Sequence, residues 1–182
     1  METNCWTTNV TLTWCESETS CKELLLLEGE TKAGQLTRHG WSGSDAELTT
    51  PVGSWMIRSR GFWGQHLVIT DAKTGKVVSE CGSSWTGAKR TIRWFDGRVY
   101  TWRQAGAFSE DFELTGPAGE VLLVTTVGGE RWSWREMFRT NGRVEVRNVD
   151  PGPARLALLS GLSWLFLLKF REEAAGAVVI MS

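Results

Sequence analysis

Five basic residues have the type and spacing that suit binding of an anionic group. They are Arg58, Arg60, Lys89, Arg90 and Arg93. Arginine and lysine bind phosphate groups, and tryptophans such as the neighbouring Trp85 and Trp102 are typical of a lipid–water boundary. The five residues are therefore a candidate site for a phospholipid headgroup. A solvated outer face of an antiparallel sheet has the same alternating pattern, so that interpretation stays open.

The sequence has no arrangement that suggests catalysis or metal binding. It lacks a nucleophile elbow, a phosphate-binding loop and a dinucleotide fingerprint. Its two histidines, His39 and His66, have no zinc-ligand spacing, and we interpret His66 as a solvated side chain. The acidic residues Glu110, Asp111 and Glu113 are typical of a polar loop. We expect no enzymatic activity, no cofactor and no metal.

The cysteines indicate the compartment. Cys5, Cys15, Cys21 and Cys81 form no C-x-x-C pair, and the start of the chain shows no signal-peptide pattern. We expect free thiols in a reducing cytoplasm, with Cys81 as a small buried thiol. A disulfide between Cys15 and either Cys5 or Cys21 stays open if the chain is exported.

Net charge argues against a nucleic-acid partner. The formal charge is −1 for 182 residues. Residues 1–50 hold eight acids and three bases, which gives −5, and residues 51–182 hold thirteen acids and seventeen bases, which gives +4. Such an asymmetry is typical of a polar surface, and it leaves open a basic binding face in the second part.

Short strands joined by turn signals must position the basic residues. Asp96-Gly97 lies between residues 91–95 and 98–102, which predicts a two-residue type I′ turn that pairs Trp94 with Val99. This register also places Tyr100 opposite Arg93.

A second hairpin is predicted around Asn141-Gly142, with residues 134–140 paired to residues 143–147 and Glu136 opposite Arg147. About a dozen short strands in all predict a barrel or a sandwich. The other candidates are residues 9–14, 23–28, 34–38, 46–50, 54–60, 65–70, 76–78, 112–114 and 121–124.

A hydrophobic helix is predicted near the C-terminus. Thirteen uncharged residues, 156–168, follow Pro151 and Pro153, which are typical of a helix start. They reach about 20 Å, which is short of the roughly 30 Å needed to span a bilayer. Because apolar residues occupy every face, we expect the helix to be enclosed in a barrel. Residues 171–182 are expected to be an edge strand or a frayed tail.

Residues 61–78, Gly-Phe-Trp-Gly-Gln-His-Leu-Val-Ile-Thr-Asp-Ala-Lys-Thr-Gly-Lys-Val-Val, followed later by Asp150-Pro151 and the hydrophobic helix, resemble the tubby-like superfamily. This group includes tubby C-terminal domains, LURP-one-related proteins and phospholipid scramblases. The resemblance covers roughly residues 46–171. It implies a closed antiparallel β-barrel of about twelve strands with the C-terminal helix threaded through the lumen.

The resemblance implies a single domain over residues 1–182, with strands within about 9–148, a central helix at about 151–170 and a tail at 171–182. The sequence lacks the Cys-rich stretch and the calcium-loop pattern of scramblases, and it has no match to the phosphoinositide-binding residues of tubby. No site residue is therefore carried over from the family.

The expected function is a non-enzymatic binding or structural module that is not transmembrane. The resemblance and the positive charge of the second part favour binding of an anionic phospholipid headgroup, or of a membrane-associated partner, on the outer barrel surface. One alternative is a lipocalin-like barrel with an apolar ligand inside and the helix outside. Another is a protein–protein interaction module with no lipid role.

Overall fold

The computed structural model describes seven stretches of the chain: residues 6–20, 22–39, 45–60, 66–83, 88–106, 109–128 and 141–180, with side chains up to residue 173. These stretches contain twelve strands and one helix. The strands are β1 (Thr11–Glu16), β2 (Glu23–Glu28), β3 (Thr31–His39), β4 (Asp45–Thr50), β5 (Gly53–Arg60), β6 (His66–Asp71), β7 (Val77–Ser83), β8 (Lys89–Trp94), β9 (Val99–Gln104), β10 (Asp111–Thr115), β11 (Val121–Val127) and β12 (Gly142–Val146), and the helix is α1 (Pro153–Ile180).

The strands form a closed barrel in which each one is antiparallel to its neighbours in sequence. The barrel closes because β1 pairs with both β2 and β12. Inward and outward side chains alternate along each strand, as in β2, where Leu24 and Leu26 are buried and Leu25 is half-buried. The predicted closed barrel is confirmed.

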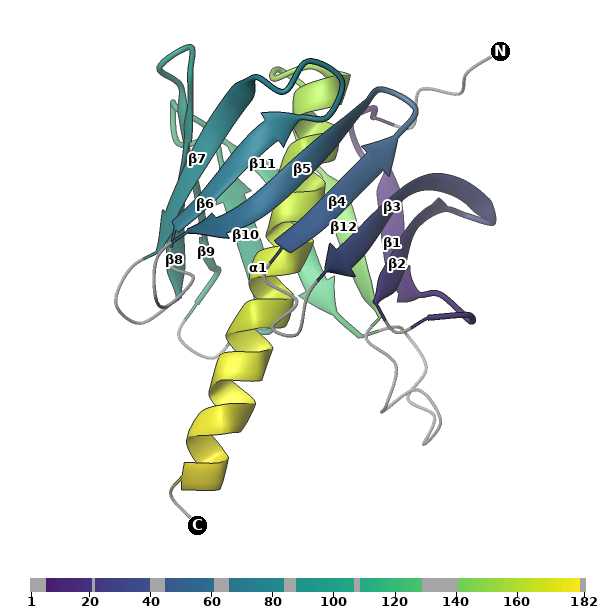
Figure 1. Cartoon of the computed structure of the whole chain (residues 1–182), viewed down its shortest axis with the longest axis vertical. Helices are drawn as coiled ribbons and strands as arrows, with labels where there is room; N and C mark the ends of the chain where they lie inside the picture. The colour runs from purple at the N-terminus through teal and green to yellow at the C-terminus, as the bar shows by residue number, and fades with distance from the viewer. Residues whose placement is uncertain are drawn as a thin grey trace.

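Helix α1 fills the lumen, as Figure 1 shows. It runs close to β4 and β5 on one side and to β10 and β11 on the other, and residues 156–169 are all buried. Trp164 stacks on Trp14 of the wall, with ring centroids 6.2 Å apart. The threaded helix is therefore confirmed, and the lipocalin-like arrangement, with the helix outside, is not the one observed.

The length and composition of α1 also satisfy the criteria for a membrane span over Pro153–Glu173, and in the described part of the chain it is the one helix that does. Of the 18-residue window that meets these criteria, 78% is buried inside the protein. The apolar surface of the helix therefore has a partner in the barrel wall.

The β8–β9 turn differs from the prediction. The backbone N–H of Trp94 donates to the carbonyl oxygen of Arg98 at 2.9 Å, so the loop has three residues, and Gly97 alone in it has a positive φ, +84°. This is a type I turn followed by a left-handed glycine. The extra residue shifts the register by one, so that Tyr100 pairs with Ile92 and Trp102 pairs with Arg90.

The prediction was also wrong at β12 and at the end of α1. Strand β12 pairs with β11 and β1, and Gly142 pairs with Val127 within the sheet rather than forming a turn. Residues 134–140, with the predicted Glu136–Arg147 ion pair, lie outside the described residues. The helix continues to Ile180, so the expected tail at 171–182 is helical over most of its length.

Candidate functional site

The structure separates the five predicted basic residues. Arg58 and Arg60 are exposed on the outer face of β5, and Lys89 and Arg93 are exposed on the outer face of β8. Arg90 faces the lumen and is 3% exposed, because it shares its strand face with Ile92. The predicted outer site is therefore wrong for Arg90.

The outer face between β5 and β8 has mixed charge. Arg58, Val68, Glu80 and Arg93 are successive partners across β5, β6, β7 and β8. Three strand spacings separate the two arginines by roughly 14 Å, and the carboxylate of Glu80 lies between them. This arrangement fits the solvated-face interpretation for Arg58 and Arg93.

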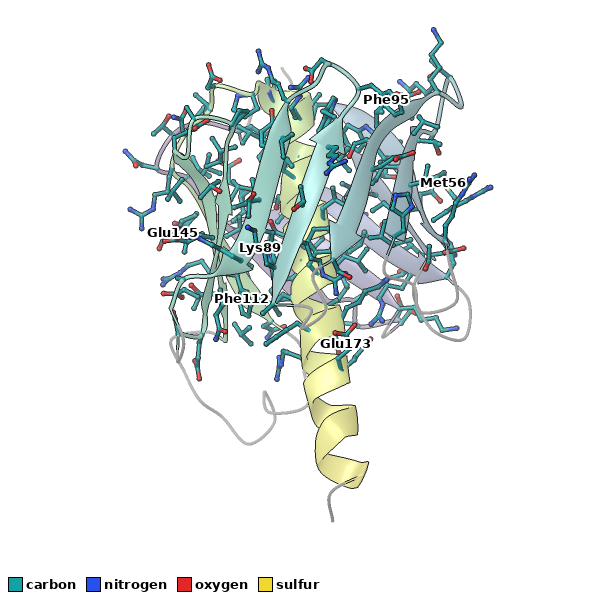
Figure 2. The ribbon with its side chains drawn as sticks, turned by 90° about the vertical axis from the view of Figure 1, so that its left-hand side faces the viewer. Met56, Lys89, Phe95, Phe112, Glu145 and Glu173 are labelled. Carbon is teal, nitrogen blue, oxygen red and sulfur yellow. The ribbon has the colours of Figure 1, made fainter. Side chains whose placement is uncertain are left out.

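A different group of charges lies where α1 leaves the barrel. Strand β3 ends at this end of the barrel with His39, β5 ends there with Arg60, and β8 begins there with Lys89. We call this end the exit mouth. Figure 2 shows Glu173 on α1 at the same end as Phe112, whereas Phe95 lies at the opposite end.

Five side chains at the exit mouth form what we call the exit collar: Arg38, Arg90, Lys169, Glu172 and Glu173. Arg38 of β3 binds Glu172 through both terminal guanidinium nitrogens, with Nη1–Oε1 at 2.8 Å and Nη2–Oε2 at 3.1 Å. Arg90 of β8 lies 3.7 Å from Glu173 between Nη2 and Oε1. Consecutive helix residues thus pair with strands on different sides of the barrel.

Aromatic rings enclose the inner part of Arg90. Its guanidinium carbon lies 5.0 Å from the ring centroid of Phe166. Phe166 contacts Trp102 edge to face, and Trp102 stacks on Phe112 with centroids 4.7 Å apart. This apolar wall explains why burial lowers the pKa of Arg90, an effect that Glu173 partly opposes.

Lys169 is the second nearly buried cation of the exit collar, with 8% of its surface exposed. The pKa of Lys169 is lowered to about 8, chiefly by burial and in addition by the charges of Arg90 and Arg38, while Glu173 and Glu172 oppose the shift. Cys81 of β7 is a buried thiol, as predicted, and burial raises its pKa to about 12. The thiol is therefore neutral near pH 7.

Sequence reasoning missed four of the five collar residues. Lys169, Glu172 and Glu173 follow the apolar run at spacings of three and four, which places them on one side of a helix. This spacing could have predicted a charged site, because a charged cluster that directly follows an enclosed helix must lie at the end of the barrel that encloses it. Arg38 has no comparable signal, since its contact with Glu172 spans 134 positions.

The other predicted polar groups lie on the surface. His66 is exposed, as predicted, and its Nε2 lies 3.6 Å from Glu80. His39 lies 3.9 Å from Glu47. Within the described ranges, no group of three or more His, Cys, Asp or Glu side chains is arranged to hold a metal ion. Cys5 and Cys21 lie outside those ranges.

Comparison of the chain with protein-family models, with curated proteins and with solved structures found no match. The resemblance to the tubby-like superfamily therefore stays a prediction.

Proposed function

We propose that the protein is a non-enzymatic module that binds anionic phospholipid surfaces through its exit mouth. The observation that carries the proposal is the juxtaposition of cations with an uncharged helix end. Helix α1 projects past the strand ends (Figure 1), and residues 174–180 contain no charged side chain. Seven helical residues extend roughly 10 Å, which suits the headgroup–acyl boundary rather than a full span of about 30 Å.

Exposed cations lie at the end of the barrel from which the helix projects. Arg60 ends β5, Lys89 begins β8, and Arg171 is on α1 just past the buried stretch. Near an anionic membrane, each such cation contributes about 1 kcal/mol of attraction. These three charges and the apolar helix end supply the two kinds of contact that a peripheral membrane protein combines.

The sequences of the segments that connect strands at the exit mouth also support binding to a membrane surface. Residues 40–44, 61–65 and 84–87, which join β3 to β4, β5 to β6 and β7 to β8, lie outside the described residues, and their sequences include Trp41, Phe62, Trp63 and Trp85. The turns at the opposite end of the barrel contain one aromatic residue, Phe95. Tryptophan is enriched at lipid–water boundaries, so the composition of these segments favours the same end of the molecule.

The test is co-sedimentation with vesicles of phosphatidylcholine alone and with vesicles that contain increasing fractions of phosphatidylserine. Each series is measured at low and at high salt. We expect binding that rises with anionic lipid and falls with salt. The double variant Arg60→Gln/Lys89→Gln should bind about thirtyfold more weakly, because it loses two cations that contribute about 1 kcal/mol each. The matched control, Lys73→Gln/Lys76→Gln, removes two cations from the opposite end and should bind like the wild type.

A second variant tests the helix end. Val178→Asp/Ile180→Asp places two carboxylates on the uncharged segment of the full-length chain, and it should weaken vesicle binding without lowering the melting temperature. Equal binding to neutral and anionic vesicles, or no binding to either, would contradict the proposal. The second result would favour a protein–protein interaction module.

A further inference from the structure

The exit collar contains more positive than negative charge. Its cations are Arg38, Arg90 and Lys169 and its carboxylates are Glu172 and Glu173, so one positive charge is in excess. The two acids are half-exposed, at 51% and 59%, whereas Arg90 and Lys169 are almost fully buried. The buried groups are therefore the cations, and the groups that neutralise them reach in from solvent.

One of the two buried cations, Arg90, is incompletely paired. Among the described residues, Nε of Arg90 has no hydrogen-bond acceptor. The one ion pair of Arg90, between its Nη2 and Glu173, is long at 3.7 Å. Arg38, by contrast, has a close bidentate partner in Glu172. A buried guanidinium with donors to spare and a neighbouring ammonium are the groups that bind phosphate in proteins.

We propose that the exit collar is a phosphate-binding site in which Arg90 and Lys169 bind the anion and Glu173 acts as an internal competitor. The inference deepens the proposed function and rests on it for the source of the phosphate, which is the headgroup of a membrane lipid. Because Glu173 is more than half exposed, its carboxylate can turn to solvent when the phosphate binds. Arg38 stays paired with Glu172 and keeps the helix in register.

Binding is measured first without lipid, as the rise in melting temperature of the full chain in inorganic phosphate against chloride at equal ionic strength. We expect phosphate, but not chloride, to raise the melting temperature of the wild type. Glu173→Gln should strengthen phosphate binding roughly fivefold, because it removes the competing carboxylate. The control, Glu145→Gln, removes a carboxylate of the outer wall that pairs with Arg143 and Arg147, and it should leave phosphate binding unchanged.

Lys169→Gln should abolish the phosphate effect, and its melting temperature in chloride reports separately whether the chain folds. A purely structural collar gives a different pattern: Glu173→Gln lowers the melting temperature and leaves the phosphate effect unchanged. That pattern, or a wild type that responds equally to phosphate and chloride, overturns the inference.

Vesicles then distinguish the two sources of phosphate. Phosphatidic acid vesicles should compete with inorganic phosphate for the wild type, and Glu173→Gln should bind them more tightly than the wild type does. If soluble phosphate binds and no vesicle does, the site stands and the membrane proposal fails. If vesicles bind but neither phosphate nor Glu173→Gln alters that binding, the membrane proposal stands and the phosphate site fails.

Discussion

Gly142 lies directly against the indole ring of Trp164. A Cβ at position 142 would stand 2.2 Å from Cζ3 of that ring and 2.7 Å from the carbonyl oxygen of Thr126. Trp164 is fully buried and stacks on Trp14, so the ring has no room to move aside. The glycine is therefore required by the close approach of strand and helix, rather than by a turn.

Gly142→Ala should lower the free energy of unfolding by about 1–3 kcal/mol, because the added methyl overpacks a fixed aromatic pair. The measurement is urea denaturation followed by tryptophan fluorescence. Gly82→Ala is the control, since a Cβ at that position meets nothing within 4 Å and the backbone has no positive φ. Equal effects of the two substitutions would show that the Trp164 contact does not constrain position 142.

The predictable part of this fold is the part set by local pattern. The uncharged run at residues 156–168 predicts a helix that is enclosed by other elements, because apolar residues occupy all its faces. The alternation of apolar and polar residues in the rest of the chain predicts strands. The register of the β8–β9 hairpin was not predictable in the same way, because Asp-Gly occurs both in two-residue turns and in three-residue turns. One added loop residue, Phe95, decides which side chains of β9 pair with Arg90 and Ile92.

The candidate site was less predictable than the fold because its members come from distant segments. The sequence predicts Arg90 as part of an outer basic patch, but Arg90 shares its strand face with Ile92 and therefore points into the lumen. The sequence also predicts an edge strand or a frayed tail at residues 171–182. Glu172 and Glu173 indicate a site only once the barrel wall is known to place Arg38 and Arg90 next to them.

Arg155 fixes the other end of α1 to the β8–β9 hairpin. Its Nη1 donates to Tyr100 Oη at 3.0 Å and its Nη2 donates to Asp96 Oδ2 at 2.7 Å, while its guanidinium lies 4.5 Å from the ring of Trp94. Arginine pairs therefore hold α1 at both ends of its buried stretch.

Arg155→Met should lower the free energy of unfolding by about 1–3 kcal/mol, because it removes a charge-assisted bond and a cation–π contact. A double-mutant cycle with Asp96→Asn isolates the ion pair, and we expect a coupling of about 1 kcal/mol. Arg98→Met, which removes a longer contact of 3.8 Å to the same carboxylate, is the control. A coupling of zero for Arg155 would mean that Asp96 does not hold the helix.

A charge within the lumen should prevent folding. Leu159 and Leu165 are fully buried on the central helix, and an aspartate at either position would be unpaired in an apolar interior. We expect Leu159→Asp and Leu165→Asp to lack a cooperative thermal transition by circular dichroism. Phe95→Asp, at a side chain that is 66% exposed, should melt like the wild type. A near-native melting temperature for either lumen variant would contradict the threaded helix.

Lys169 should make stability depend on pH in the alkaline range. Its pKa is about 8 in the folded chain, chiefly because burial disfavours the charged form, against an ordinary value of 10.5. Between these pH values the unfolded chain binds more protons than the folded chain, so the free energy of unfolding rises as pH rises from about 8 to about 10.5.

Lys169→Met should remove that rise and, at pH 7, stabilise the protein by about 1–3 kcal/mol, since a charged group no longer has to be desolvated. The measurement is the free energy of unfolding by urea at several pH values, compared between variant and wild type so that other titrating groups cancel. For the control Lys76→Met, at an exposed position, the difference in free energy of unfolding from the wild type should not change with pH. If Lys169→Met destabilises the protein at pH 7, Glu172 and Glu173 stabilise the ammonium of Lys169 more than burial penalises it, and the expected alkaline rise in stability is contradicted.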